Sequence, residues 1–147
     1  MEVQTIGICS DHAGFNLKEH VKSWLSAKGW RFEDFGTFGT DSVDYPDFAH
    51  PMAQALENGE VYPGIAICGT GNGISMTLNK HQGVRAALCW QPEISEFARL
   101  HNDANVLVMP GRYISFEEAD EILEAFFGTE FEGGRHARRV AKIPVEK

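Results

Sequence analysis

The sequence is poor in cysteine and has no metal-ligand motif. Its three cysteines, Cys9, Cys68 and Cys89, lie in or at the ends of apolar segments. An odd number in such places argues against a disulfide framework and fits a reducing compartment. No Cys-x-x-Cys occurs and no two histidines stand four residues apart. We therefore predict that the protein holds no metal.

The sequence also lacks the marks of membrane and nucleic-acid-binding proteins. No apolar run approaches the roughly 18 residues that cross a bilayer, and residues 1–5 do not resemble a signal peptide. Lysine and arginine number 13 against 21 aspartate and glutamate, which gives a net charge of −8. A nucleic-acid partner is therefore not expected, whereas a few arginines could still bind a small anion in one cleft. We expect a cytoplasmic protein with no membrane partner.

The apolar pattern predicts one α/β domain. The chain has 147 residues, 43% of them hydrophobic, which is enough for one real core. Strands are expected over residues 5–9, 30–35, 64–68, 84–89 and 105–109, and helices over residues 17–28, 48–58, 74–81, 92–101 and 116–127. Alternating strands and helices predict right-handed βαβ units. The expected fold is a single three-layer α/β/α domain with a five-stranded, mainly parallel, Rossmann-like sheet.

Two of these helices have informative faces. In the first helix, Lys18, Glu19 and Lys22 lie opposite the apolar stripe and are expected to face solvent. In the fourth helix, His101 shares the apolar face. A histidine in that position is either a core or interface residue or a catalyst, and the pattern alone leaves both open.

A glycine-rich turn follows the third strand. Cys68 ends the strand, and Gly69-Thr70-Gly71-Asn72-Gly73 leads into the next helix. Such a turn directs unpaired backbone N–H groups at one point, where they could hold an oxyanion. The spacing is neither G-x-G-x-x-G nor a phosphate-binding loop with Gly-Lys-Ser/Thr, so no dinucleotide cofactor is indicated. The plainer interpretation is a tight strand–helix connection.

Cys68 is the strongest candidate for chemistry. Buried cysteines are most often structural, and we assign Cys9 and Cys89 to that class. Cys68 instead faces a helix N-terminus and a ring of N–H groups, a setting that lowers the pKa of a thiol toward neutrality. A thiolate there could accept a proton or attack a carbonyl.

Other candidates lie at the same edge of the predicted sheet or in the tail. Asp11 and His12 follow the first strand, so they should meet Cys68 at the carboxyl edge, although they could simply cap a helix. Arg112 follows the fifth strand, and Arg135 and Arg139 share a face if the tail is helical. Converging arginines would hold a phosphate. Together with the thiol, these groups fit proton transfer beside the carbonyl of a phosphorylated small molecule.

The same residues carry a resemblance to a known family. The motifs, in order along the chain, are Ser10–Phe15, Asp44–Pro46, Ile67–Ser75, Asn79–Lys80, Arg85–Ala86, Arg99–Val106 and Glu132–His136. From about residue 6 to residue 139 the chain resembles the type B ribose-5-phosphate isomerases, whose family includes galactose-6-phosphate and allose-6-phosphate isomerases. The resemblance implies an aldose–ketose isomerase of the non-oxidative pentose phosphate pathway that uses no metal or cofactor.

The resemblance also implies roles for the site residues. Cys68 would move a proton between C2 and C1 through an enediolate, and Thr70 and His101 would help to open the furanose ring. Some relatives use a glutamate base further along the loop, but this chain has no acidic residue there. The implied substrate contacts are the sugar with Asp11, Tyr45 and Asn102, the enediolate with Gly69, Gly71, Asn72 and Gly73, and the phosphate with His12, Arg112, Arg135 and Arg139. Arg138, beside Arg139, is the competing candidate for the phosphate.

Relatives in this family are dimers, sometimes paired into tetramers, with each site shared between two subunits. The implied contributions to the partner's Cys68 come from His101, Asn102, Arg112, Arg135 and Arg139. The C-terminal tail, residues 129–147, would then pack on the partner. Three alternatives stay open: a six-carbon phosphosugar as substrate, a phosphosugar-binding module without turnover, and redox sensing by Cys68.

Overall fold

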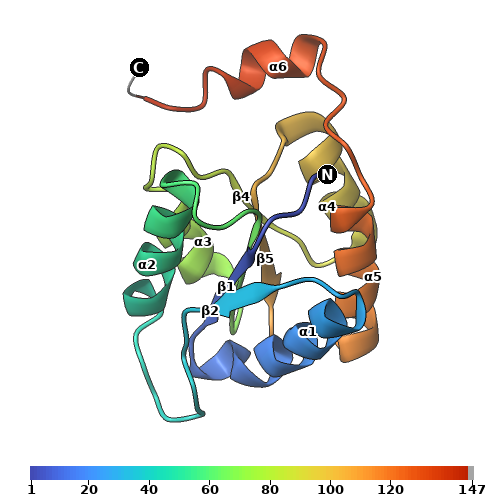
Figure 1. Ribbon diagram of the computed structural model, residues 1–147. Helices are drawn as coiled ribbons and strands as arrows, with labels where there is room; N and C mark the ends of the chain where they lie inside the picture. Colours follow the sequence, from blue (N-terminus) through green and yellow to red (C-terminus); the bar gives the residue numbers. More distant parts are fainter. Residues whose placement is uncertain (146–147) are drawn as a thin grey trace.

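The computed structural model describes residues 1–145 as a sheet of five parallel strands between two layers of helices (Figure 1). The strands are β1 (Ile6–Ser10), β2 (Phe32–Asp34), β3 (Gly64–Cys68), β4 (Ala86–Leu88) and β5 (Val106–Pro110). The helices are the 3-10 turn η1 (His12–Gly14), α1 (Phe15–Ala27), α2 (Pro46–Glu57), α3 (Asn72–Leu78), α4 (Pro92–Asn102), α5 (Phe116–Phe127) and α6 (Arg135–Val140). The predicted α/β/α fold is confirmed.

The order of the strands places a crevice at one edge of the sheet. The order is β2-β1-β3-β5-β4. From β1 the chain passes through α1 to β2 on one side, and from β3 it passes through α3 to β4 on the other side. The loops that follow β1 and β3 therefore diverge at the carboxyl ends of two neighbouring strands. In open α/β sheets this is the position where ligands bind.

Two apolar cores cover the two faces of the sheet, and alternate residues of each strand supply them. In β3, Ile65 and Ile67 pack into the core formed with α1, α4 and α5, while Ala66 and Cys68 pack into the core formed with α2 and α3. A strand buried on both faces needs a continuous apolar run rather than an alternating one. Fully burying one isoleucine stabilises the fold by about 1.5–3 kcal/mol.

Several element boundaries differ from the prediction, and helices α1 and α2 each begin two residues earlier than expected, at Phe15 and Pro46. Helix α3 begins at Asn72, two residues before the expected start at Ile74, because Gly71 has a φ of +81° and turns the chain directly into the helix. Strands β2 and β4 are shorter than expected, at three residues each. Both lie at the edges of the sheet, where only one neighbour supplies hydrogen bonds.

The expectation that Lys18 faces solvent is wrong. Its side chain is fully buried, and Nζ lies 2.5 Å from Oδ2 of Asp34 at the end of β2. Asp34 also accepts hydrogen bonds from Lys22 Nζ (2.9 Å) and from the Gly36 N–H (2.9 Å). A buried ammonium group is tolerated because it is paired with a carboxylate. The pair ties α1 to β2 and to the start of the loop over residues 36–45.

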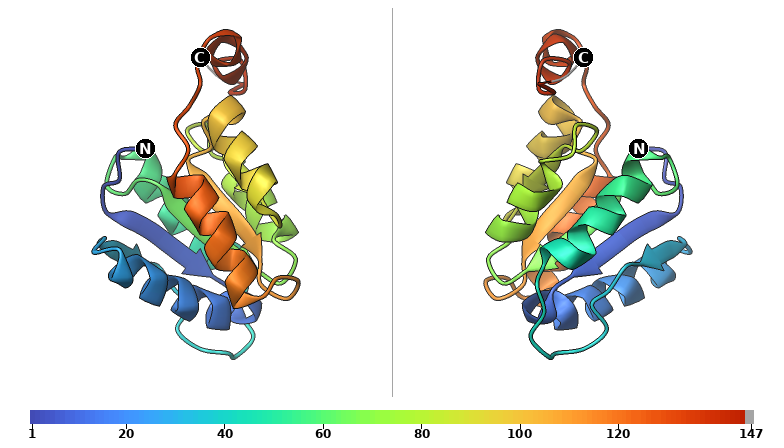
Figure 2. Two further views of the ribbon diagram at one scale, coloured as in Figure 1. Left: turned by 90° about the vertical axis from the view of Figure 1, so that its right-hand side faces the viewer. Right: turned by 90° about the vertical axis from the view of Figure 1, so that its left-hand side faces the viewer.

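The tail leaves the body of the molecule at the end opposite the loop over residues 36–45. Figure 2 shows α6 standing beyond the last turn of α4. The tail is helical over Arg135–Val140, so the condition under which Arg135 and Arg139 would share a helical face is met. Further on, the Val145 N–H donates to Gln82 Oε1 at 3.0 Å. Within residues 1–145, every helix is too short or too polar to cross a membrane.

Candidate active site

Loops from four parts of the chain surround a hollow of about 440 Å³ at the carboxyl edge of the sheet. They follow β1, β3 and β5 and precede α2. The lining residues are Asp11, His12, Ala13, Val43, Asp44, Tyr45, Cys68, Gly69, Thr70, Gly73 and Arg112. The predicted convergence of the loops after β1 and β3 is therefore confirmed.

The loop between β3 and α3 surrounds the Cys68 thiol with backbone groups. Cys68 is almost buried, and the Gly71 N–H donates to its Sγ at 3.2 Å. A Cβ at Gly71 would lie 2.3 Å from Leu88 Cδ1, so the positive φ and the lack of space both require glycine. The next N–H, of Asn72, points back to Thr70 Oγ1 at 3.2 Å. The Gly71 N–H thus lies against the thiol. The residues of this loop that line the hollow are Cys68, Gly69, Thr70 and Gly73.

The other two cysteines differ from Cys68 in their surroundings. Cys9 is fully buried, and burial together with the nearby Asp34 raises the pKa of its thiol. Burial likewise raises the pKa of the Cys89 thiol to about 12. Neither residue lines the hollow. Their predicted structural role agrees with these surroundings.

The loop after β1 combines a structural cap with groups that face the hollow. Asp11 Oδ1 accepts a hydrogen bond from the Gly14 N–H at 3.1 Å and caps η1, which leaves Oδ2 for a ligand. His12 Nδ1 accepts from the Val43 N–H at 3.2 Å. Since Nδ1 is an acceptor, the imidazole proton belongs on Nε2, where it could be donated to an anion.

Tyr45 lies against the backbone of the glycine loop. It precedes the first residue of α2, and its side chain is about one-third exposed. A Cβ at Gly73 would lie 2.4 Å from Tyr45 Cζ and 2.7 Å from its Oη. The missing side chain at Gly73 therefore lets the tyrosine ring close one wall of the hollow.

Arg112 stands in the same hollow as the Cys68 of its own chain. Its N–H donates to the Gly69 carbonyl at 3.0 Å, and its side chain passes over Gly69. The expectation that Arg112 serves the partner's cysteine is therefore corrected. The physical reason is the strand order: β5 lies beside β3, so the loops that follow them adjoin.

Four other predicted site residues lie at the opposite end of the molecule. Helix α4 runs back from the carboxyl edge, so His101 and Asn102 in its last turn are carried away from Cys68 (Figure 1). Arg135 and Arg139 lie on α6 at that same end. One chain does not bring these residues to the thiol.

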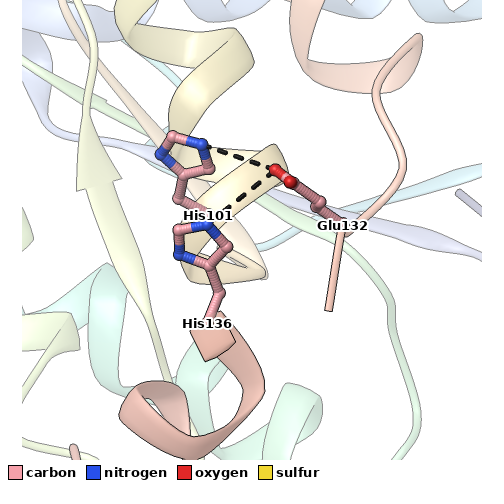
Figure 3. A group of neighbouring side chains, drawn as sticks. All are labelled: His101, Glu132 and His136. Atoms are coloured by element: carbon pink, nitrogen blue, oxygen red, sulfur yellow. Dashed lines mark ion pairs between the residues drawn. The ribbon is translucent and has the colours of Figure 1, made fainter. Parts of the chain in front are cut away.

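His101 belongs to a cluster that the sequence did not reveal. Its ring stacks on His136, with centroids 4.2 Å apart and planes 10° apart. Both Nε2 atoms face Glu132 Oε2, at 3.6 Å from His101 and 3.8 Å from His136 (Figure 3). Desolvation and the positive charges of His101 and Arg135 lower the pKa of His136, against the smaller effect of Glu132. The cluster forms only where the tail, with Glu132 and His136, contacts the last turn of α4, so the sequence alone gave no sign of it.

Two further residues of the site escaped the sequence reasoning. Val43 orients His12 through its backbone N–H, which no side-chain pattern reveals. Gly14 lies against β3, where a Cβ would be 2.4 Å from the Ile67 carbonyl oxygen. For Gly14, the only feature in the sequence that could have indicated this close contact was a glycine directly before the first predicted helix.

Comparisons with known proteins agree with this geometry. A family model described as ribose/galactose isomerase matches residues 6–143. The chain is 42% identical to ribose-5-phosphate isomerase B of Escherichia coli over 96% of this chain and 95% of that protein. It is 49% identical to the ribose 5-phosphate isomerase of Thermotoga maritima, whose crystal structure matches with a TM-score of 0.94 over 98% of this chain and 99% of the other. It is also 40% identical to the Mycoplasma genitalium enzyme solved with bound ribulose 5-phosphate, with a TM-score of 0.89 over 95% and 93%.

Proposed function

The chain belongs to the ribose/galactose isomerase family, and from this membership we propose that it interconverts D-ribose 5-phosphate and D-ribulose 5-phosphate. The observation that carries the proposal is the Cys68 thiol, which faces backbone donors in a hollow that also contains Arg112. Relatives at 42% identity bear the name ribose-5-phosphate isomerase B, and one related structure holds ribulose 5-phosphate.

In the proposed reaction Cys68 acts as the base. Its thiolate removes the proton from C2 of the open aldehyde, which leaves an enediolate with the negative charge on the C1 oxygen. A proton then passes from the C2 hydroxyl to the C1 oxygen, and the thiol returns its proton to C1 as the C2 carbonyl forms. The N–H groups from Gly69 to Gly73 would hold the enediolate oxygen, and losing one such donor typically costs about 3 kcal/mol in the barrier. Two of these N–H groups, of Gly71 and Asn72, donate to Cys68 Sγ and Thr70 Oγ1 in the free protein, so they would exchange these partners for the enediolate oxygen. No electrons are exchanged with a cofactor in this scheme.

The hollow also offers groups for the rest of the substrate. The residues that line the hollow include Asp11, His12, Tyr45 and Arg112. We propose that Asp11 Oδ2 and the Tyr45 hydroxyl bind the sugar hydroxyls and that His12 and Arg112 bind the phosphate. A guanidinium group binds a phosphate through two parallel hydrogen bonds, and the Nε2–H of His12 adds a third donor. The family resemblance assigns the same roles.

We propose that a second copy of the chain completes the site. His101, Asn102, Arg135 and Arg139 lie too far from their own Cys68 to serve it (Figure 2). On α4, Ile94 and Phe97 are 38% and 39% exposed, which gives an uncovered apolar face beside His101. In the dimer, the tail over residues 129–147, of which residues 146 and 147 lie outside the described part of the chain, would lie on the partner. There His101 would open the furanose ring together with the partner's Thr70. Two dimers could pair further into a tetramer.

The test of the reaction is turnover of the purified protein on ribose 5-phosphate in buffer with a chelator. We expect turnover that is lost in Cys68→Ala and kept in Cys89→Ser, whose thiol lies outside the hollow. Turnover only on allose 6-phosphate or galactose 6-phosphate would keep the mechanism and change the substrate. Binding without turnover on any of the three would make the protein a binding module and refute the proposal. The buried free thiols fit a reducing compartment, so we also propose a cytoplasmic location.

The shared site has its own test. Cys68→Ala and His101→Ala chains should each be inactive alone, and mixing them after denaturation and refolding should restore part of the activity. In a mixed dimer one site keeps both the intact thiol and the intact imidazole. Sedimentation of the wild type measures the assembly independently. A fully active monomer would contradict the shared site.

A further inference from the structure

The cluster at the end of α4 surrounds His101 on three sides. Phe97 packs on one face of the imidazole, with centroids 4.9 Å apart, and His136 stacks on the ring at 4.2 Å. Glu132 Oε2 faces the Nε2 edge at 3.6 Å, an ion-pair distance longer than a hydrogen bond (Figure 3). Within residues 1–145, His101 Nδ1 makes no hydrogen bond, and the His101 side chain is 36% exposed.

A backbone hydrogen bond fixes the tail to α4 beside the clamp that Phe97, Glu132 and His136 form around His101. The Glu132 N–H donates to the Leu100 carbonyl at 2.9 Å, which satisfies one of the free carbonyls in the last turn of α4. The position of Glu132 thus depends on backbone rather than on its own side chain, which is half exposed. The carboxylate is consequently available for His101.

The charges around the cluster single out Glu132. Arg135 and Arg139 lie on α6 beside His136, and desolvation, His101 and these arginines lower the pKa of His136. The His136 ring stacks on His101, and both rings face the same carboxylate. Glu132 is the anion that faces both imidazoles among the residues that the structure describes.

These observations assign Glu132 as a positioning residue for His101, an inference that rests on the proposed isomerase function: we propose that it keeps the proton on Nε2, so that Nδ1 is the nitrogen that opens the sugar ring. Nδ1 takes the proton from the anomeric hydroxyl while the bond from C1 to the ring oxygen breaks and the C1 carbonyl forms. The same nitrogen then gives the proton to the ring oxygen, so no proton is gained or lost overall. Glu132 stabilises the transient imidazolium.

His101, Glu132 and His136 each have one potential metal-ligand atom, and these three atoms lie within 4.8 Å of one another. A metal ion shared by the three is therefore the alternative role for this cluster. The stacking argues against that role. The two rings lie in nearly parallel planes, 10° apart, with centroids 4.2 Å apart, so the in-plane lone pairs of their nitrogens do not converge, whereas a tetrahedral ion needs ligands that converge on one point. The arginines of α6 add positive charge beside the cluster. The buried Nε2 of His136, which lacks a hydrogen-bond partner, is oriented by the same carboxylate.

The test separates ring opening from proton transfer by changing the substrate. Ribose 5-phosphate is mostly a closed furanose in water, whereas ribulose 5-phosphate stays open because its C5 hydroxyl carries the phosphate. Glu132→Gln keeps the shape of the side chain and removes its charge. We expect kcat/KM on ribose 5-phosphate to fall by about 10-fold or more. Exchange of the C1 hydrogen of ribulose 5-phosphate with deuterated water, followed by NMR, should stay within about 2-fold of wild type.

An isotope effect gives a second readout. Once ring opening limits the forward rate, the rate difference between ribose 5-phosphate and its C2-deuterated form should shrink in Glu132→Gln. The matched control is Glu130→Gln, which alters an exposed carboxylate paired with the amino terminus and should leave all three measurements unchanged. The thermal unfolding midpoints of Glu132→Gln, Glu132→Ala and Glu130→Gln, compared with that of the wild type, check that each variant keeps the fold.

The possible results separate the two proposals. An equal loss of forward turnover and of exchange in Glu132→Gln, or no loss in either, would overturn the role of Glu132. An unchanged isotope effect would do the same. Activity of the wild type that disappears with a chelator would point to the metal instead. A wild type that shows neither turnover nor exchange would refute the proposed function itself.

Discussion

Gly73→Ala should make the protein less active without making it less stable. Gly73 lies inside α3, where alanine is favoured over glycine by about 0.5–1 kcal/mol because the unfolded chain loses freedom. The new Cβ would be 2.4 Å from Tyr45 Cζ. Carbon atoms in contact lie about 3.5–4.0 Å apart, so the ring must move by more than about 1 Å.

The displacement of the Tyr45 ring should affect activity more than the stability of the fold. Tyr45 is about one-third exposed, so its ring can turn into solvent at little cost to the folded state. The substrate then loses the Tyr45 hydroxyl. A hydrogen bond of this kind is worth about 0.5–1.5 kcal/mol, which corresponds to a fall in kcat/KM of about 2- to 10-fold. The free energy of unfolding should stay the same or rise.

Urea unfolding and initial rates on ribose 5-phosphate measure the two effects. Tyr45→Ala supplies the control, because in that background Gly73→Ala should lower kcat/KM no further. If the loss from Gly73→Ala persists in full without the tyrosine ring, the effect does not pass through Tyr45 and the reasoning fails. A rise in stability with unchanged kcat/KM would show that Tyr45 does not bind the sugar.

Further predictions concern the buried ion pair and the phosphate. Lys18→Met should lower the free energy of unfolding in urea by about 3 kcal/mol, the low end for a broken buried pair, because Asp34 keeps Lys22 as a partner. Burial alone would raise the pKa of Asp34, but the hydrogen bonds from Lys18, from a backbone N–H and from Lys22 outweigh it and hold that pKa below its usual value. The stability that this pair adds is therefore complete above the ordinary aspartate pKa, and it is lost as the pH falls through the lower pKa that Asp34 has in the folded protein. In Asp34→Asn the free energy of unfolding should depend less steeply on pH in the acid range. An unchanged slope of the free energy of unfolding against pH would contradict this. Arg112→Lys should raise KM for ribose 5-phosphate by about 10-fold with a smaller change in kcat, because lysine lacks the paired donors that grip a phosphate; a change confined to kcat would place Arg112 elsewhere in the reaction.

The strands and most helices were predictable because the sheet is buried on both faces. Runs such as Ile65-Ala66-Ile67 admit few other interpretations, and the capping box at Ser115 marks the start of α5. Lys18 was misplaced because helical periodicity sorts residues by polarity alone. Its partner, Asp34, lies 16 residues away and becomes a neighbour only when β2 pairs with β1.

The candidate site was predictable to the extent that it follows strand ends. Cys68 and Asp11 close neighbouring parallel strands, and the topology alone brings them together. The place of Arg112 depends on β5 lying between β3 and β4, an order that local pattern does not encode. The clamp around His101 needs a contact between α4 and the tail, so Glu132 and His136 gave no signal of their own.

The residues of the proposed active site fall into two groups that are separated along the chain as well as in space. The hollow around Cys68 is lined by residues up to Arg112, whereas Glu132 and the arginines of α6 follow α5, which ends at Phe127. A chain shortened after Phe127 would therefore keep the proposed base and His101, and would lose the carboxylate that we propose orients His101 and the arginines that we propose bind the phosphate. In a mixed dimer of the proposed kind, such a shortened chain would still offer the hollow around its own thiol to the tail of its partner.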